Sequence, residues 1–407
     1  MGSTKIIAGV EIGTSKVVVL VGEVVPGHGL NIIGMGQSTS VGMRKGEIED
    51  LSAVSDCTHA AILSAEKSAG SQIEHVYLSK SGPSLVGMSS HGVTSVNSPD
   101  NVVSAEDVRR ACENAKSKAL PAGRIYVHHM RSAYRVDGQL VHRPIGQIGN
   151  KLEALYWHVH ANERAVSNHI HVINGFGLDV DDMIVSSIAS GSILTTETEK
   201  KQGVLVVDIG SGTTDYALYR EGRVVRTGVI PVGGDHLTND LSLGLRISPK
   251  MGESVKLRYA KAIIDKSDKD DSVLLHGDLT IGDRPIPRVS IYKIAHSRME
   301  ELFMILKNRL GSVLNTQNLP GGVILTGGSS RLPGIDQLAE DTMGVPARLG
   351  GSPAWVTEKE LREPEYACSL GLLYYGYYGQ QSEEDNLPSR SSKGLAGWMK
   401  NLFSTRT

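Results

Sequence analysis

The residues with the clearest chemistry lie in two stretches that repeat one plan: an apolar run, an acid, a glycine-containing turn and a second apolar run. The later stretch, 204–219, places Asp208 and Asp215 on either side of a turn that contains Gly210 and Gly212. Glycine lets backbone amides approach an anion, and a carboxylate holds a hard cation, usually through water. The stretch therefore predicts a β-hairpin whose tip suits a phosphate chain carrying a divalent ion. An ordinary surface hairpin fits the same residues when they are taken alone.

The same plan opens the chain. Glu11 and Gly13 stand where Asp208 and Gly210 stand in the later copy. Two phosphate hairpins in separate halves of a chain indicate a duplicated fold with a nucleotide clamped between the halves. A further glycine pair at 233–234 precedes an amphipathic helix, where free amides and the helix dipole favour an anion. A simple strand-to-helix turn is the alternative for that pair.

The elements that must position these residues predict a mixed α/β chain. Because 407 residues exceed what one hydrophobic core supports, we expect several subdomains. Residues 165–176 fit a helix or a strand. The apolar spacing predicts helices over 51–70, 104–119, 291–310 and 366–378, and strands near 5–25, 31–36, 74–79, 124–134, 152–160, 204–219 and 323–326.

Composition excludes several classes of function. The formal charge of −2 gives no electrostatic case for nucleic acid as a partner. The three cysteines are scattered and typical of reduced cytosolic thiols, and neither a signal peptide nor a membrane-spanning run is evident. Histidines at 158, 160, 169 and 171 could bind zinc. Since no cysteine or acid cluster completes such a site, we expect a polar strand face instead.

Four signatures, in this order, resemble the actin-like ATPase superfamily: the first hairpin, a connecting helix around 185–191, the second hairpin, and an adenosine loop at 325–334 followed by a second connecting helix. Within that superfamily the chain most closely resembles the FtsA family of bacterial cell-division ATPases. The likeness rests on Glu11 in place of the usual aspartate and on the sequences at 43–46, 144–146, 149–153 and 324–328.

The resemblance implies an actin-like duplicated α/β fold, with two lobes around a nucleotide cleft and an inserted subdomain of the FtsA type. It divides the chain into a first lobe over 1–83 and 163–192, an inserted subdomain over 84–162, a second lobe over 193–228 and 305–379, a nucleotide-capping and FtsZ-binding subdomain over 229–304, a linker over 380–393 and an amphipathic membrane-targeting helix over 394–407.

The same resemblance implies ATP and Mg²⁺ as ligands. Asp208 would orient the metal, with Glu11 facing it from the first lobe, and Asp182 lies where actin-like hydrolases place a water-positioning glutamine. Because aspartate is shorter than glutamine, we expect at most slow ATP hydrolysis, with the nucleotide acting mainly as a structural switch. The implied ATP-binding residues are Gly13, Thr14, Ser15, Lys16, Asp208, Gly210, Ser211, Gly212, Thr213, Gly233, Gly234, Asp235, Glu253, Lys256, Gly327, Gly328, Ser329 and Arg331.

The C-terminal tail carries separate information. Residues 380–393 are rich in Ser, Glu and Gln, which is typical of a flexible linker. The next segment has apolar residues at i, i+3, i+4, i+7 and i+8 with lysines and an arginine around them, which indicates a helix that lies in a membrane surface. A helix that docks on the protein itself is the alternative. The stripe consists of Leu395, Trp398, Met399, Leu402 and Phe403.

Together these features predict an ATP-binding, actin-like protein that polymerises at the cytoplasmic face of the inner membrane. By resemblance it would tether the C-terminal peptide of FtsZ, with Arg298 and Glu301 as contacts, and help to recruit later membrane proteins of the division machinery. Solvated helix charges are the alternative for that pair. Two rival functions remain: a small-molecule kinase on the same fold, and an actin-like pilus-assembly ATPase.

Overall fold

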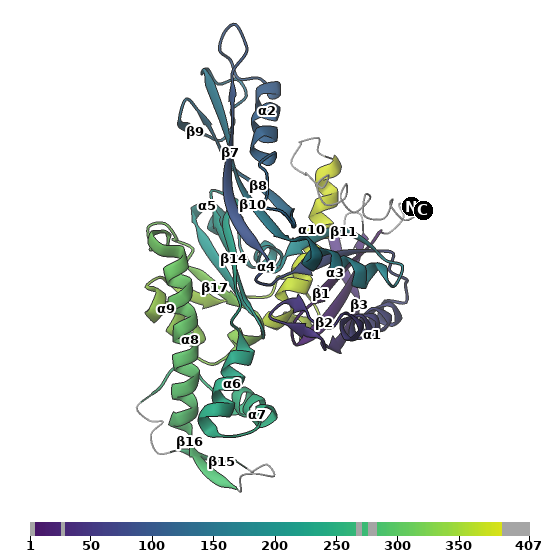
Figure 1. Ribbon diagram of the computed structural model, residues 1–407, viewed down its shortest axis with the longest axis vertical. Coiled ribbons are helices and arrows are strands. Elements are labelled where there is room, and N and C mark those ends of the chain that lie inside the picture. Colours follow the sequence, from purple (N-terminus) through teal and green to yellow (C-terminus); the bar gives the residue numbers. More distant parts are fainter. Residues whose placement is uncertain (1–4, 26–28, 266–270, 276–282, 385–407) are drawn as a thin grey trace.

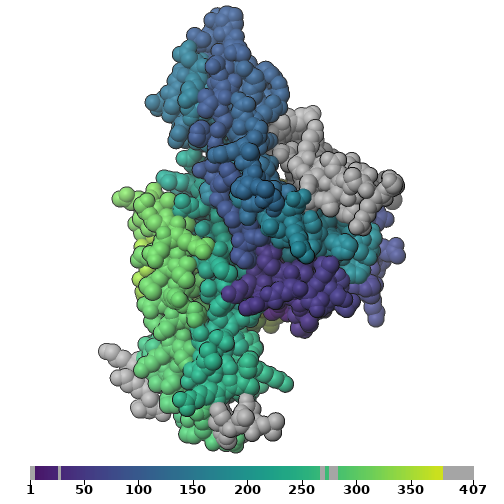
Figure 2. Space-filling view, in the orientation of Figure 1, coloured from purple at the N-terminus to yellow at the C-terminus, as the bar shows by residue number. Residues whose placement is uncertain are grey.

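The computed structural model describes residues 5–25, 29–265, 271–275 and 283–384. Figure 1 shows two lobes side by side, an inserted subdomain above them and a second small subdomain below the second lobe. In the space-filling view of Figure 2 the inserted subdomain projects from the body of the molecule. The expected membrane helix at 394–407, and residues 385–393 of the expected linker, lie outside the described residues.

The first lobe is built on a five-stranded sheet in the order β11-β6-β1-β2-β3. Adjacent strands from β1 to β3 are antiparallel, whereas β6 and β11 run parallel to β1. The long helix α1 (Leu51–Ala69) covers β3 and ends at Gly70, which adopts the left-handed conformation that glycine accepts without a steric penalty. The strands are β1 (Lys5–Ile12), β2 (Lys16–Val25), β3 (Gly29–Thr39), β6 (His75–Lys80) and β11 (Asp179–Val185).

The second lobe repeats this sheet in the order β14-β13-β12-β17-β18. The same sequence of two antiparallel and two parallel pairings recurs, so β12 corresponds to β1 and β13 to β2. The duplication expected from the two hairpins is therefore present in both sheets. The strands are β12 (Val204–Ile209), β13 (Thr214–Arg220), β14 (Arg223–Ile230), β17 (Val323–Thr326) and β18 (Ala347–Leu349).

Two connecting helices, α4 (Ser186–Leu194) and α10 (Ala367–Glu384), lie between the sheets and cross closely. A Cβ built on Gly371 of α10 would lie 2.0 Å from the carbonyl oxygen of Ala189 in α4, so only glycine fits this crossing. The two helices share one hydrophobic core with the first sheet and with one face of the second.

The two connecting helices have contacts on both sides of the expected boundaries between the lobes. The division from sequence placed residues up to 379 in the second lobe, but α10 packs against β1, β2 and β6 of the first lobe. The helix α4, expected in the first lobe, contacts β6 and β11 of that lobe and also β12 and β13 of the second. The helix α10 also continues through residues 380–384, which the sequence analysis assigned to the linker.

The inserted subdomain contains a sheet in the order β7-β10-β8-β9, covered on one face by α2 (Ala105–Lys116), and has its own small core. The capping box predicted at Ser104 and Asp107 is present at the start of α2. The strand β7 was not predicted. The strands are β7 (Val86–Ser95), β8 (Arg124–Val136), β9 (Gln139–Val141) and β10 (Lys151–Asn162).

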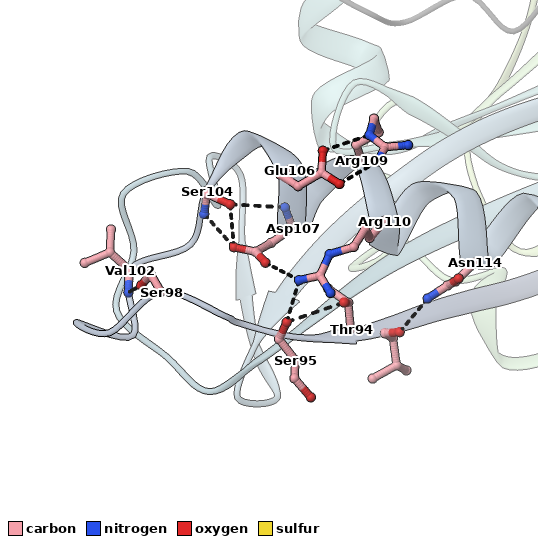
Figure 3. Close-up of polar contacts among 11 residues, drawn as sticks. Thr94, Ser95, Ser98, Val102, Ser104, Glu106, Asp107, Arg109, Arg110 and Asn114 are labelled. Carbon is pink, nitrogen blue, oxygen red and sulfur yellow. Dashed lines mark hydrogen bonds and ion pairs between the residues drawn. The ribbon is translucent and has the colours of Figure 1, made fainter.

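Side chains of α2 also protect the free edge of β7 (Figure 3). Arg110 donates to the carbonyl oxygen of Ser95, and Asn114 donates to that of Val93. An edge whose carbonyls are already bonded is a poor template for another strand.

The Arg110 guanidinium is itself held by Asp107 at the start of α2. Burial would raise the pKa of the Asp107 carboxyl, but the hydrogen bonds from Ser104 and the charge of Arg110 outweigh burial and lower this pKa to about 2.

The histidines expected on a polar strand face occupy different environments. His158 and His160 lie in β10 and are buried, and His158 is 2.6 Å from the Ser90 hydroxyl and 2.8 Å from the Nδ1 atom of His129. Burial lowers the pKa of His158 below its usual value. Residues 165–176, left open between helix and strand, fall mostly in helix α3 (Glu163–Asn174), where His169 is buried. Within the described residues no cluster could hold zinc.

The subdomain below the second lobe packs helices on the other face of the second sheet, in a second large core. The long helix predicted at 291–310 begins a little earlier and buries the expected apolar stripe. The helices and strands of this subdomain are α6 (Gly234–Leu245), α7 (Pro249–Tyr259), β15 (Ser272–Leu275), β16 (Arg284–Pro287) and α8 (Arg288–Leu310). The remaining elements are β4 (Met43–Arg44), β5 (Glu47–Ile48), α5 (Glu197–Gln202) and α9 (Ile335–Met343).

Candidate nucleotide site

The two glycine turns have the same geometry. The Gly13 amide donates to the Lys16 carbonyl oxygen at 2.9 Å, and the Gly210 amide donates to the Thr213 carbonyl oxygen at 2.9 Å. A Cβ on Gly13 would lie 2.8 Å from the Lys16 carbonyl oxygen, so a larger residue would disturb the turn. The repeat seen in the sequence is therefore also a repeat of backbone structure.

The acid in each hairpin receives a hydrogen bond from a connecting helix. Ser369 of α10 donates to the Glu11 carboxylate, and Ser190 of α4 donates to the Asp208 carboxylate at 2.7 Å. Burial raises the pKa of Glu11 to about 7, and the nearby Asp208 charge adds to this effect. Burial also raises the pKa of Asp208, although the Ser190 hydroxyl opposes the shift.

A third carboxylate, Asp215, completes the cluster. It lies directly opposite Asp208 in the hairpin register and is only 3% exposed. One oxygen accepts a hydrogen bond from Ser81 of the first lobe at 2.6 Å, while the other, Oδ1, has no partner among the described residues. Burial, together with the Asp208 charge, raises the pKa of Asp215 to about 7. The contact between Ser81 and Asp215 also joins the two lobes.

This cluster fits a divalent cation that is shared with phosphate. Buried acids close to one another resist ionisation, and a cation stabilises their charged forms. Within the described residues no group of three or more His, Cys, Asp or Glu side chains could hold a metal alone. Mg²⁺ normally takes one or two carboxylates and completes its coordination with water and phosphate oxygens. Glu11 and Asp208 are the residues that could hold it, and the unpartnered oxygen of Asp215 adds an acceptor.

The glycine pair at 233–234 lies against the second hairpin. The Gly234 amide donates to the Gly210 carbonyl oxygen at 2.9 Å, and the Asp235 amide donates to that of Ser211 at 2.8 Å. The Ser211 hydroxyl is 3.1 Å from the Asp235 carboxylate. Gly233 precedes α6 directly, so the first two amides of this helix are bonded to the second hairpin turn and hold the helix N-terminus beside it.

Residues 327–331 approach from the other side. Gly327 has a φ of 85°, and a Cβ there would lie 2.4 Å from the Asp208 carboxylate, so glycine is required on both counts. Ser329 donates to the Gly210 carbonyl oxygen at 3.0 Å. Lys256 donates to the Gly234 carbonyl oxygen at 3.3 Å and pairs with Glu253 at 2.7 Å. Glycines and side chains from four separate segments thus converge around the second hairpin.

Basic residues of the site are paired with acids just before α10. Lys16 lies 3.1 Å from Glu365 and 3.9 Å from the ring centre of Tyr366. Arg331 lies 3.0 Å from Glu365 and 3.6 Å from Glu363. Each of these cations would have to leave or share its partner to bind a nucleotide.

In the first hairpin, Thr14 faces the second lobe. The Thr14 hydroxyl accepts from the Gly46 amide at 3.2 Å, and a Cβ on Gly212 would lie 2.5 Å from that hydroxyl oxygen. The neighbouring Ser15 is exposed. Most predicted ATP-binding residues are therefore brought together, from both lobes and from the capping subdomain.

Asp182 lies in β11, the edge strand of the first sheet next to β6. It pairs with Tyr77 in the register of β11 and β6, three residues before Val185, which pairs with Lys80. The end of β6, at Lys80 and Ser81, is the part that reaches the carboxylates. The water-positioning role that the resemblance implies for Asp182 stays a prediction.

The predicted FtsZ contacts are partly engaged within the subdomain. Arg298 of α8 forms ion pairs with Asp240 of α6 and with Glu301. The Glu301 side chain is 52% exposed, against 22% for Arg298. Arg298 thus holds two helices together, whereas Glu301 is the member of the pair that is open to a partner.

Sequence reasoning assigned no role to several residues that support the site. Ser190 and Ser369 lie in the connecting helices, and Ser81 and Glu365 lie far from either hairpin in the sequence. The one available signal was the duplication, since two equivalent buried acids require two equivalent donors behind them.

Comparison with known proteins extends these observations. Residues 205–371 match the family model described as "Cell division protein FtsA", and residues 82–160 match "SHS2 domain inserted in FTSA". The chain is 35% identical to Cell division protein FtsA of Pseudomonas aeruginosa over 93% of this chain and 91% of that protein. It is 32% identical to the Escherichia coli K12 protein of that name over 98% and 97%, and 30% identical to the Bacillus subtilis one over 92% and 84%.

Solved structures share the fold at lower identity. The PilM-PilN type IV pilus biogenesis complex contains a chain with a TM-score of 0.65 and 18% identity, covering 91% of this chain and 98% of that one. MreB5 of Spiroplasma citri bound to ADP gives a TM-score of 0.57 at 16% identity, covering 94% and 99%. At these identities the likeness concerns the actin-like fold alone.

Proposed function

The chain belongs to the FtsA family of cell-division proteins, and from that premise we propose that it binds ATP with Mg²⁺ between its lobes and tethers FtsZ filaments to the inner membrane. The observation that carries the nucleotide part is the meeting of two equivalent glycine turns, each with a partly buried acid, at the interface of the lobes. Small-molecule kinase and pilus-assembly functions lack comparable support, since the relatives at 30–35% identity over most of the chain are division proteins.

The residues have distinct tasks in this proposal. The two glycine turns lie against the phosphate chain, the dipole of α6 favours its negative charge, and Asp208 with Glu11 orients the cation. Bound Mg²⁺ would neutralise the developing negative charge on the phosphates. Because the acids resist ionisation in the absence of a cation, Mg-ATP stabilises a charged form that the empty cluster disfavours. Binding would thus hold the lobes together, and the closed form would polymerise.

The membrane part rests on the sequence of the tail. Within the described residues no helix is long and apolar enough to cross a bilayer. The apolar stripe from Leu395 to Phe403 would attach the chain peripherally, weakly for one copy and more strongly for a filament through avidity. Later division proteins with membrane segments would then meet the inserted subdomain.

Sedimentation with acidic liposomes tests the tether. The full chain with Mg-ATP is compared with a version that ends at Glu384, because α10 runs to that residue and an earlier end would remove part of a helix. We expect filaments of the full chain to pellet with the liposomes and the truncated chain to stay in the supernatant. If both versions pellet with the liposomes, or if neither does, the tail is not the segment that attaches the protein to the membrane.

A peptide titration tests the FtsZ contact. Glu301→Lys reverses the exposed charge of the predicted pair, and Glu300→Lys is a matched control on the next residue, whose side chain is 47% exposed. We expect Glu301→Lys alone to weaken binding of the FtsZ C-terminal peptide, by roughly tenfold for a charged contact. Equal affinities of the two variants would place the peptide elsewhere.

A further inference from the structure

A small hairpin of the first lobe reaches the nucleotide site with a lysine at its tip. The strands β4 and β5 pair Arg44 with Glu47, so Lys45 and Gly46 form a two-residue loop. Both loop residues have positive φ, 49° for Lys45 and 75° for Gly46, which is the pattern of a type I′ turn. The first position of such a turn favours Asn, Asp or Gly, and a residue such as lysine is strained there. A strained residue in a cleft suggests a use for its side chain.

The tip is fixed on two sides. The Gly46 amide donates to the Thr14 hydroxyl of the first phosphate turn at 3.2 Å, and Lys80 donates to the Gly46 carbonyl oxygen at 3.1 Å. Lys80 is only 1% exposed and pairs with Glu47 of the same hairpin at 2.9 Å. A Cβ on Gly46 would lie 2.8 Å from the Gly82 amide nitrogen, so the packing leaves no room to shift. The conformation of Lys45 is therefore imposed by its surroundings.

From this position Lys45 faces the phosphate-binding parts of the second lobe. A Cβ on Gly212, in the second glycine turn, would lie 3.0 Å from the Lys45 Cα. Burial, and then the charge of Lys45, lower the pKa of His236 in the first turn of α6, so that charge reaches the N-terminus of this helix. Across the part of the chain that the structure describes, the Lys45 ammonium has no hydrogen bond or ion pair. The adjacent Arg44, by contrast, is 69% exposed and pairs with Glu49.

We propose that Lys45 is a phosphate-binding residue that crosses the cleft from the first lobe and contacts the terminal phosphate of a nucleoside triphosphate. This inference rests on the proposed ATP binding and adds a way to distinguish triphosphate from diphosphate. An ammonium placed between the two glycine turns attracts the end of the phosphate chain, where the negative charge is greatest. Because the hairpin is joined to Thr14 and Lys80, this contact transmits the presence of the terminal phosphate to the first lobe.

Nucleotide titration of the full chain tests the assignment, with Mg²⁺ and either a non-hydrolysable ATP analogue or ADP as the probe. The variants are Lys45→Asn, which suits a type I′ turn but lacks the charge, Lys45→Arg, which keeps the charge, and Arg44→Asn as a control on the neighbouring cation. For Lys45→Asn we expect about a tenfold loss of affinity for the ATP analogue and less than threefold for ADP. Lys45→Arg and Arg44→Asn should stay within about threefold of the wild type for both ligands.

The thermal midpoint of unfolding of the nucleotide-free variants distinguishes a loss of affinity caused by the missing charge from one caused by a less stable fold. Lys45→Asn should unfold at the same temperature as the wild type or higher, because asparagine is the better turn residue. If it unfolds lower, Lys45→Gln and Lys45→Arg are compared, and equal affinities of these two for the ATP analogue overturn the proposal. An unchanged affinity of Lys45→Asn, or an equal loss for both nucleotides, overturns it as well. If the wild type binds neither nucleotide, the proposed function itself fails.

Discussion

The two phosphate hairpins have the same backbone but different side chains. In the first, Glu11 pairs in register with Val18, whereas in the second Asp208 pairs with Asp215. The first hairpin instead carries Lys16 at the turn position where the second has Thr213. The two hairpins therefore share one backbone geometry, while the second carries two facing acids and the first carries one acid and a lysine at its turn.

The supporting contacts of the hairpins remain symmetric. Each acid receives one serine hydroxyl from one connecting helix, Ser369 for Glu11 and Ser190 for Asp208. The difference between the hairpins thus lies in the face that meets the ligand. Equivalent substitutions in the two hairpins measure how far that division of tasks extends.

The largest difference is expected from the two acids. Asp208→Asn should lower the affinity for Mg-ATP by about 100-fold and Glu11→Gln by about tenfold, because the second hairpin holds most of the charge that attracts the cation. Neither variant should lower the thermal midpoint of the nucleotide-free protein, since burial already disfavours both charges. Titration of each variant with a fluorescent ATP analogue and Mg²⁺ checks this. Equal losses would mean that the cation is shared evenly between the lobes.

A smaller difference is expected in the pH dependence of stability, to which the second hairpin contributes through Asp215. Burial raises the pKa of Asp215 from 3.8 to about 7, so between those values the folded chain binds a proton that the unfolded chain releases. The free energy of unfolding of the nucleotide-free protein therefore falls as pH rises from about 4 to about 7, by at most about 1.4 kcal/mol per pH unit for this group. Asp215→Asn should flatten this slope.

Denaturant titrations at several pH values measure the slope, with Glu49→Gln, at a 59% exposed side chain, as the control. Glu11, whose pKa is also raised to about 7, contributes in the same direction. Mg-ATP should abolish the slope, because a bound cation keeps these acids charged. A stability that rises with pH over this window in the nucleotide-free protein would contradict the assigned shifts.

The smallest effects are expected where the hairpins are alike. Ser190→Ala and Ser369→Ala each remove a buried hydroxyl that donates to a carboxylate, so each should lower the free energy of unfolding by about 1–2 kcal/mol at neutral pH. Only Ser190→Ala should also weaken Mg-ATP binding measurably, because Ser190 supports Asp208, the acid from which we expect the larger contribution to cation binding. Chemical denaturation and nucleotide titration of both variants test this symmetry. A twofold or greater disparity in stability loss would show that the two helices support their acids unequally.

The parts that could be predicted from sequence are those with strong local signals. Glycine turns flanked by β-branched runs gave both hairpins, and the Ser104 capping box gave the start of α2. The strand β7 was missed because Gly, Ser and His interrupt its apolar alternation, and its burial depends on α2 and β10, which lie elsewhere in the chain. Residues 165–176 could not be assigned to a helix rather than a strand, because a buried histidine, His169, interrupts the apolar stripe of α3.

The parts that could not be predicted depend on contacts across the fold. Ser81 meets Asp215 across the two lobes, and no spacing in the sequence reports that contact. The role predicted for Asp182 came from family resemblance, and its pairing with Tyr77 of β6 has no counterpart in the spacing of the sequence. The tip of the β4–β5 hairpin was read as a polar connection, since a lysine in a type I′ turn has no local signature.

The crossing of α4 and α10 also sets an order of events during synthesis. The first strand of the chain, β1, packs against the last described helix, α10, so the first lobe cannot bury this face until nearly the whole chain has left the ribosome. The N-terminal half therefore emerges with an apolar sheet face exposed and waits for its cover. Any product that stops before residue 367 lacks α10 and keeps that face exposed, which favours its capture by proteases and chaperones.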